Sequence, residues 1–208
     1  MTRGCTVFTV GHSSHSLKRL IDLLARHRIT AVADVRSKPY SRSNPQFNKE
    51  DAQRSLRAVG LAYVFMGHQL GGRPTDRQLY IDGKLNYDLL ARTPEFLAGL
   101  DRVIKGARIE RIALMCAEKD PLACHRGVLI SRHLVDRAIT VTHILGDGRL
   151  ETHADSESRL LREVGIDHPD LFSSNAERIA EAYERRGQQI AFGDGHVDME
   201  TSNARATR

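Results

Sequence analysis

The sequence contains no tryptophan, and aromatic residues make up only 5% of its 208 residues. Proteins that hold single-stranded nucleic acid by stacking bases on exposed rings need several aromatic residues, so this class is disfavoured. Long apolar runs are also missing, because none approaches the roughly 20 residues of a membrane-spanning helix. Residues 1–11 carry too short an apolar patch for a signal peptide. We therefore expect a cytoplasmic protein with no membrane partner.

Cysteine is scarce as well, with three residues in the whole chain. An odd number without an export signal disfavours a disulfide framework and favours thiols that serve chemistry or packing. The 31 basic residues exceed the 26 acidic ones, which gives a net charge of +5. This excess favours anionic partners only mildly, and a basic, well-solvated surface is the simpler explanation for it.

Alternating apolar runs and helical patterns define the expected fold. Strands are predicted at residues 6–10, 29–35, 61–65, 111–116 and 139–145, and helices are predicted to begin at Ser16, Asn48, Thr93 and Asp120. The strands are near-continuous apolar runs, which is typical of strands covered by helices on both faces. The pattern predicts a three-layer α/β fold with a mainly parallel, five-stranded sheet and helices on both faces.

This α/β domain is expected to span residues 1–150 and to contain the functional site. Residues 151–186 are predicted to form a C-terminal helical extension, because Ser174 and Glu177 make a capping box for a helix. Residues 187–208 are polar and lack periodicity, so we expect a disordered tail there. The polar segment 66–88 is too long for a plain connection and is expected to be a functional loop or lid.

Residues capable of chemistry follow several of the predicted strands. In open parallel sheets, ligands bind outside the carboxyl ends of the strands, so we expect these side chains to converge in one pocket. They are His12 and Ser13 after the first strand, Asp34 and Arg36 after the second, Cys116 and Glu118 after the fourth, and Cys124, His125 and Arg126 at the next helix start.

The candidate catalytic residues are Cys116, Glu118, Cys124 and Asp34. A helix start and Arg126 supply positive potential, which favours a reactive thiolate at Cys116 or Cys124. Glu118 and Asp34 would then form the acid/base pair. The spacing differs from the Cys-x5-Arg loop of cysteine phosphatases, because Leu122 stands where the arginine would be.

The candidate substrate-binding residues surround this set. Two arginines would bind negative charge, three polar side chains would orient the ligand, and two glycines would let the backbone approach it closely. They are Arg36 and Arg126; His12, Ser13 and His125; and Gly71 and Gly72.

Simpler explanations exist for the same residues. Both cysteines fit a buried core with Glu118 paired to Arg126, Asp34 fits an ion pair with Arg36, and the two glycines fit a plain turn. Zinc is another alternative, with Cys116, Cys124, His125 and His12 as ligands. The spacing Cys-x7-Cys-His is unusual for a zinc site, so we expect no bound metal.

The order of these motifs resembles one known family. Gly11-His12-Ser13, Asp34-Val35-Arg36 with Pro39 and Ser41, Leu70-Gly71-Gly72, Cys116-Ala117-Glu118 and Cys124-His125-Arg126 follow one another between about residues 6 and 146. Together they are similar to the domain of unknown function 488 family of bacterial and archaeal α/β proteins. The resemblance implies one α/β domain with one polar site, and it implies no particular reaction.

These observations predict an enzyme that performs hydrolysis or group transfer on a phosphate-bearing substrate, a nucleotide or a nucleic acid. The alternative is a non-catalytic protein that binds nucleic acid or another anionic ligand. A peroxide-sensitive pair of thiols at Cys116 and Cys124 is a third interpretation. The residues single out no cofactor and no oligomeric state.

Overall fold

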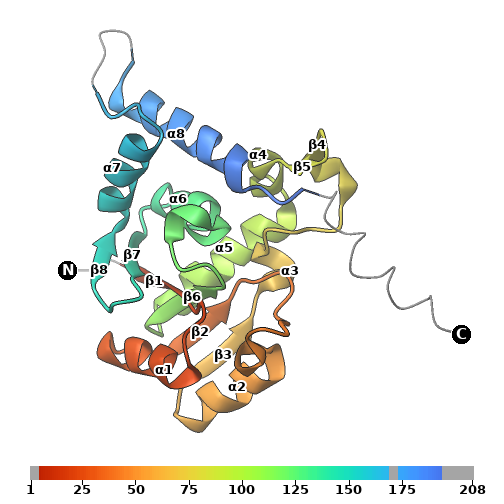
Figure 1. Ribbon diagram of the computed structural model, residues 1–208, viewed down its shortest axis with the longest axis vertical. Coiled ribbons are helices and arrows are strands. Elements are labelled where there is room, and N and C mark those ends of the chain that lie inside the picture. Colours follow the sequence, from red (N-terminus) through yellow and green to blue (C-terminus); the bar gives the residue numbers. More distant parts are fainter. Residues whose placement is uncertain (1–4, 169–172, 194–208) are drawn as a thin grey trace, which may run out of the picture.

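The computed structural model describes residues 5–168 and 173–193. At its centre lies a six-stranded sheet with the order β3-β2-β6-β1-β7-β8 (Figure 1). The strands are β1 (Thr6–Gly11), β2 (Ala31–Asp34), β3 (Ala62–Phe65), β6 (Ile112–Cys116), β7 (Thr140–Ile144) and β8 (Leu150–Thr152). Five strands run parallel, as predicted, and β8 pairs antiparallel with β7. The prediction of five strands missed β8, because its three residues are too few to show an alternating pattern.

Helices cover both faces of the sheet, which confirms the three-layer α/β architecture. One face packs against α1 and α2, and the other packs against α5 and α6 (Figure 1). These helices are α1 (Leu17–Arg26), α2 (Lys49–Ala58), α5 (Pro94–Ala107) and α6 (Arg132–Val135). Two of the predicted helix starts make the expected N-cap, since Ser16 and Thr93 each accept a hydrogen bond from the backbone N–H three residues later. Asn48 precedes α2 as predicted, but its side chain makes no cap hydrogen bond.

The central strand β6 shows why its sequence is a continuous apolar run. Ile112 and Leu114 face the layer of α5 and α6, whereas Ala113 and Met115 face the layer of α1 and α2. All five residues of the strand are buried. Because β6 lies between β1 and β2, the carboxyl ends of these three strands stand side by side at one edge of the sheet.

The polar segment 66–88 is folded. It contains α3 (Gly67–Leu70), the 3-10 turn η2 (Arg77–Leu79), the hairpin strands β4 (Tyr80–Ile81) and β5 (Lys84–Leu85), and the start of α4 (Tyr87–Ala91). A further 3-10 turn, η1 (Pro45–Phe47), lies in the loop between β2 and α2.

The helix expected to begin at Asp120 begins later. Asp120 instead caps the 3-10 turn η3 (Pro121–Ala123), where its carboxylate accepts from the N–H of Leu122. Cys124 is extended, with φ −144° and ψ 140°, and so interrupts the helix. The widened π-helical turns of η4 (Arg126–Ser131) follow and lead directly into α6.

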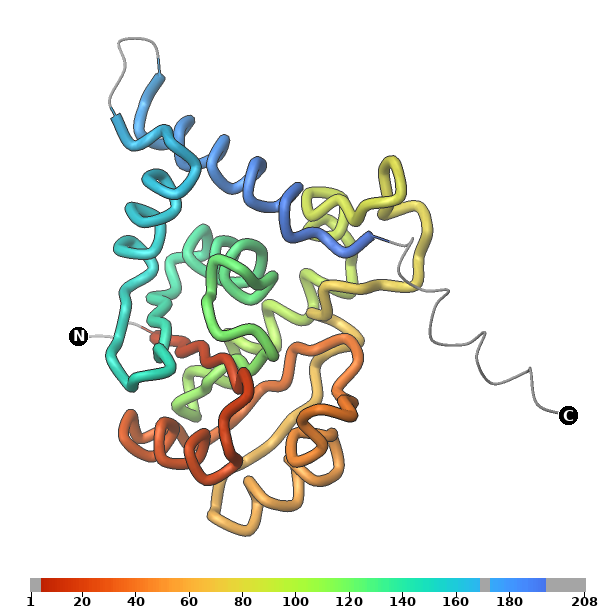
Figure 2. The backbone as a smooth tube through the Cα atoms, in the orientation of Figure 1, coloured from red at the N-terminus to blue at the C-terminus, as the bar shows by residue number. Residues whose placement is uncertain are grey.

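The chain after the sheet forms α7 (His153–Glu163) and α8 (Asn175–Ile190). The predicted capping box at Ser174 and Glu177 is present. Figure 2 shows α8 running from α7 toward the β4–β5 hairpin, where the carbonyl of Phe192 accepts from the N–H of Leu85 at 2.9 Å. The boundary expected for the tail, residue 187, lies within α8, and residues 191–193 are described as well. The rest of the expected tail, residues 194–208, lies outside the described residues.

In the part of the chain that the structure describes, no helix combines the length and the apolar composition needed to cross a membrane.

A buried chain of hydrogen bonds joins this C-terminal extension to the sheet. It runs from Thr9 to His143 (2.8 Å), from His143 to His153 (3.1 Å), from His153 to the Tyr183 hydroxyl (2.8 Å), and on to Glu157 (3.0 Å). The imidazole rings of His143 and His153 can make all of these hydrogen bonds while neutral, because in each ring Nε2–H donates and Nδ1 accepts. Burial is the largest cause that lowers the pKa of both histidines, and it brings the pKa of His153 to about 4.

The stability of the fold should therefore decline in mild acid. The unfolded chain takes up protons on its histidines below pH 6.5, whereas His153 stays neutral in the folded protein down to about pH 4. That difference corresponds to a loss of about 3 kcal/mol from His153 across this interval. Urea unfolding at several pH values should show a shallower decline in His153→Gln, whereas the exposed control His68→Gln should keep the wild-type slope. An equal slope in all three proteins would contradict the prediction.

Candidate functional site

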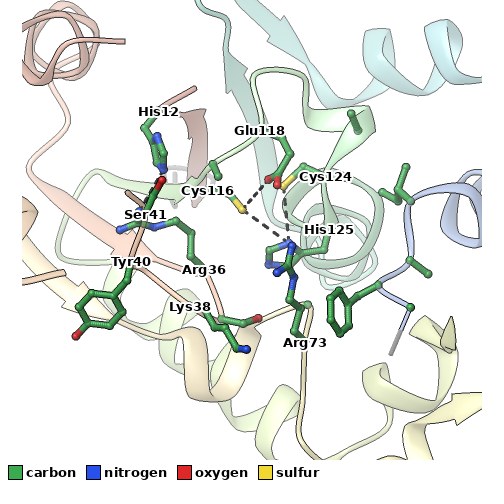
Figure 3. Close-up of a pocket in the computed structure, with 18 of the residues that line it drawn as sticks. His12, Arg36, Lys38, Tyr40, Ser41, Arg73, Cys116, Glu118, Cys124 and His125 are labelled. Carbon is green, nitrogen blue, oxygen red and sulfur yellow. Dashed lines mark hydrogen bonds between the residues drawn. The ribbon is translucent and has the colours of Figure 1, made fainter. Parts of the chain in front are cut away.

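A pocket of about 480 Å³ lies at the carboxyl ends of β1, β2 and β6 (Figure 3). His12, Arg36, Cys116, Glu118, Cys124, His125 and Gly72 line it, so seven of the eleven predicted site residues meet there. The other four, Ser13, Asp34, Gly71 and Arg126, are not among its lining residues. Residues 190–193, which comprise the last residue of α8 and the three that follow it, form a further wall.

Two thiols and an imidazole form the most reactive part of the pocket. The sulfurs of Cys116 and Cys124 each lie 3.8 Å from Nδ1 of His125, and the three atoms lie within 4.8 Å of one another. Glu118 adds a carboxylate, because its Oε2 lies 3.1 Å from the sulfur of Cys116. These four side chains form what we call the thiol cluster.

The orientation of His125 is fixed by its surroundings. Its Nε2–H donates to the carbonyl of Val35 at 3.1 Å, so Nδ1 faces the two sulfurs. Gly72 allows the ring to lie there, because a Cβ at this position would be 2.9 Å from the ring carbon Cγ. The close backbone approach predicted for this glycine is therefore made to His125.

The electrostatics distinguish the two thiols. Burial opposes ionisation of Cys124, but a hydrogen bond with the Cys116 thiol and the positive charges of Arg126 and His125 outweigh it and hold the pKa of Cys124 well below its usual value. The hydrogen bond with Cys124, followed by burial, raises the pKa of Cys116. The Cys124 sulfur also raises the pKa of His125 against the effect of burial. A thiolate at Cys124 beside an imidazolium at His125 is the arrangement that these directions favour.

Glu118 is exposed at the mouth of the pocket. Partial desolvation by the pocket walls, followed by the charge of the Cys124 sulfur, raises the pKa of its carboxyl group. Its side chain reaches both solvent and the Cys116 thiol.

Asp34 lies behind the pocket as the partner of Arg36. The guanidinium of Arg36 makes a bidentate pair with the carboxylate, with Nε to Oδ1 at 2.9 Å and Nη2 to Oδ2 at 2.6 Å. The hydroxyl of Tyr63 also donates to Oδ2 at 2.7 Å. Asp34 is completely buried, so the structure supports its simpler interpretation as the ion-pair partner of Arg36.

His12 is held neutral on the opposite side of the pocket. Its Nδ1–H donates to the Ser13 carbonyl at 2.8 Å, and its Nε2 accepts from Nη1 of Arg36 at 3.2 Å. The ring stacks on Phe47 with centroids 4.3 Å apart. Burial is the main cause that lowers the pKa of His12 to about 4. Ser13 therefore contributes to the site through its backbone carbonyl, which orients the ring of His12.

Arg126 is buried behind the thiol cluster rather than exposed in the pocket. Its Nη1 and Nη2 donate to the carbonyls of Glu118 (2.7 Å) and Lys119 (3.0 Å). It therefore binds the backbone of the loop, and not the Glu118 carboxylate. Gly11 allows this close packing, since a Cβ there would lie 1.9 Å from the Glu118 carbonyl oxygen.

Two cationic residues of the pocket were missed by the sequence analysis. Lys38 lies two residues after Arg36, and Arg73 directly follows the Gly-Gly pair. Each is a single basic residue in a loop, which is a weak signal in a chain with 31 lysines and arginines. Arg73 stacks over the ring of Phe192 at 4.6 Å, so the C-terminal wall meets the cationic side of the pocket.

Replacing Arg126 with alanine should destabilise the fold. The change removes two charge-assisted hydrogen bonds from a side chain that is 1% exposed, and we expect a loss of about 3 kcal/mol in the free energy of unfolding. Arg137 is the matched control, because its exposed guanidinium also donates to a backbone carbonyl, that of His133. Arg137→Ala should cost less than about 1 kcal/mol in the same urea titration. Equal losses in the two variants would contradict the anchoring role of Arg126.

The comparisons with known proteins place the chain in one family. Residues 16–133 match the family described as "Domain of unknown function DUF488". Neither the curated proteins nor the solved structures gave a match. The matched segment covers more than half of the 208 residues and includes every residue of the thiol cluster. The chain therefore belongs to the DUF488 family.

Proposed function

We propose that this protein is a thiol-dependent enzyme that acts on a phosphate-bearing substrate by hydrolysis or group transfer. The observation that carries the proposal is the thiol cluster facing the cationic residues Arg36, Lys38 and Arg73 within one pocket (Figure 3). A site that only binds anions would need no more than the three cations. The thiol cluster adds two thiols, an imidazole and a carboxylate, which can supply the nucleophile and the proton carrier that catalysis requires.

The cations are suited to binding phosphate oxygens. Arg36 is held rigidly by Asp34, and its Nη1 edge lies in the wall of the pocket beside His12. Lys38 and Arg73 are exposed and reach the same space from two different loops. A substrate phosphate would thus be bound by Nη1 of one rigidly held guanidinium and by two flexible cationic side chains. In this arrangement, Asp34 is a positioning residue that acts through Arg36.

The first chemical step uses Cys124 as the nucleophile. Its sulfur attacks the electrophilic group of the substrate, so that a bond from sulfur to this group forms as the bond to the leaving oxygen breaks. His125 gives the proton on Nδ1 to the leaving oxygen, because Nδ1 faces the sulfur at 3.8 Å. The products of this step are a covalent intermediate on Cys124, a neutral His125 and a released hydroxyl compound.

The second step restores the enzyme. Nδ1 of His125 takes a proton from water, and the resulting hydroxide attacks the group bound to Cys124. The bond to sulfur breaks and its electron pair returns to Cys124. Glu118 lies at the mouth of the pocket, where its carboxylate positions the incoming water or, in group transfer, the hydroxyl of a second substrate. The sulfur of Cys116 lies 3.8 Å from the same Nδ1. The hydrogen bond of its thiol with Cys124 stabilises the negative charge on the Cys124 sulfur.

The three cysteines are free thiols, which agrees with the reducing cytoplasm that we propose as the location of the enzyme.

Substitution of Cys124 provides the direct test. We expect the wild-type protein to hydrolyse a member of a panel of nucleotides, dinucleotides and chromogenic phosphate mono- and diesters. Turnover should fall at least about a hundredfold in Cys124→Ser, because a hydroxyl is a much weaker nucleophile. Cys5→Ser is the matched control, since Cys5 precedes β1 at the opposite end of the sheet, and its turnover should be unchanged.

Mass spectrometry after an acid quench should locate the covalent intermediate on the peptide that contains Cys124. Full turnover in Cys124→Ser would refute the nucleophile. Binding of phosphate without turnover of any panel member would refute the enzyme and support the alternative, a protein that binds anionic ligands.

The role of the exposed cations can be tested by phosphate binding. Inorganic phosphate at a hundred times its Kd should stabilise the wild-type protein by about 2.7 kcal/mol. Arg73→Ala should lower the affinity for phosphate while changing the stability without phosphate by less than about 0.5 kcal/mol, because the side chain is exposed. Arg92→Ala, an exposed arginine outside the pocket lining, serves as the control. An unchanged phosphate response in Arg73→Ala would remove Arg73 from the anion site.

A further inference from the structure

We propose that the sulfurs of Cys116 and Cys124 and Nδ1 of His125 bind one Zn²⁺ ion at the floor of the pocket, leaving one coordination position open to the substrate. This site uses the atoms that the proposed function assigns to catalysis. Zinc binding itself does not rest on that function, whereas the inhibition argued below does.

The geometry of the three atoms fits a tetrahedral ion. Zinc lies about 2.3 Å from sulfur and about 2.0 Å from nitrogen. Tetrahedral angles then place a sulfur and a nitrogen about 3.5 Å apart, and two sulfurs about 3.8 Å apart. Both sulfurs lie 3.8 Å from Nδ1 of His125, and all three atoms lie within 4.8 Å of one another. Shifts of a few tenths of an ångström to about 1 Å bring the three atoms to coordination distances.

The residues around these ligands orient them as metal sites require. A histidine that binds a metal through one nitrogen usually donates its other N–H to a carbonyl or carboxylate, and Nε2–H of His125 donates to the carbonyl of Val35. The backbone N–H of Arg126 points at the sulfur of Cys124 at 3.4 Å, which stabilises a charged thiolate ligand. The ring of His125 therefore needs no rotation to present Nδ1 to the ion.

With three protein ligands, the fourth coordination position of the ion would be filled by a water or substrate molecule from the pocket. Three protein ligands with one open position are typical of zinc sites that exchange a water or substrate molecule. Cys116, Cys124 and His125 all line the pocket, so the open position faces its interior. His12 does not join the set, because its Nδ1 donates to the Ser13 carbonyl and its Nε2 accepts from Arg36.

Zinc at this site would block the nucleophile of the proposed enzyme. Both lone-pair donors of the mechanism, the Cys124 sulfur and Nδ1 of His125, become ligands. Zn²⁺ should therefore inhibit turnover at one equivalent, and a chelator should restore it.

The experiment measures Zn²⁺ binding to the full chain under reducing conditions by competition with a chromophoric chelator. We expect one equivalent to bind to the wild-type protein, and Cys116→Ser, Cys124→Ser and His125→Gln each to weaken binding at least tenfold. Cys5→Ser is the control and should bind as the wild type does. Co²⁺ added to the unaltered protein should give the near-ultraviolet charge-transfer absorption of cobalt–thiolate bonds, which tests the site even where a variant fails to fold.

Weak binding with no thiolate absorption would overturn the zinc site while leaving the proposed enzyme in place, because turnover is measured without metal. Equal binding by Cys124→Ser and wild type would overturn it too. One tight equivalent with thiolate absorption supports the site, whether or not a phosphate ester is turned over. Turnover that one bound equivalent of Zn²⁺ leaves unchanged would overturn the inhibition alone.

Discussion

The guanidinium of Arg126 anchors the loop that joins the two thiols of the pocket. Cys116 ends β6 and Cys124 follows the 3-10 turn η3, so their sulfurs meet only if the chain between them turns back on itself. Arg126 fixes this reversal by donating charge-assisted hydrogen bonds to the carbonyls of Glu118 and Lys119. The same buried charge also favours a thiolate at Cys124. One residue therefore shapes the loop and polarises the cluster.

The pocket separates its charges into two systems that do not neutralise each other. Arg36 has its carboxylate partner beneath it in Asp34, while Cys124 and His125 balance one another across the floor. Because His12 is neutral and stacked on Phe47, it adds no charge between the two systems. An anionic group near Lys38 and Arg73 therefore meets positive potential that no carboxylate other than Glu118 offsets among the lining residues.

The sheet was predictable because strands covered on both faces need apolar residues at every position, as Ile112–Cys116 shows. The convergence of residues from β1, β2 and β6 followed from the parallel order of the strands. The start of the helix after β6 was not predictable, since the N-cap signal at Asp120 is real but serves a three-residue turn. The burial of Arg126 was missed for the same reason, because a continuous helix would have pointed its side chain toward the ligand. The wall formed by residues 190–193 depends on tertiary contacts and has no local pattern.

The site is assembled from parts of the chain that differ in their relation to the family. All four members of the thiol cluster, together with Arg36 and Arg73, lie within the matched residues 16–133. Residues 190–193 lie outside that segment, yet they line the same pocket, and the ring of Phe192 packs on Arg73. The family segment thus contains the reactive and charged groups, whereas the C-terminal extension limits the size of the space beside them. Since α8 is tied to the sheet through Tyr183, His153 and His143, the position of this wall depends on the buried hydrogen-bond chain. It also depends on the packing of α8 against η3 and η4, the two turns on either side of Cys124.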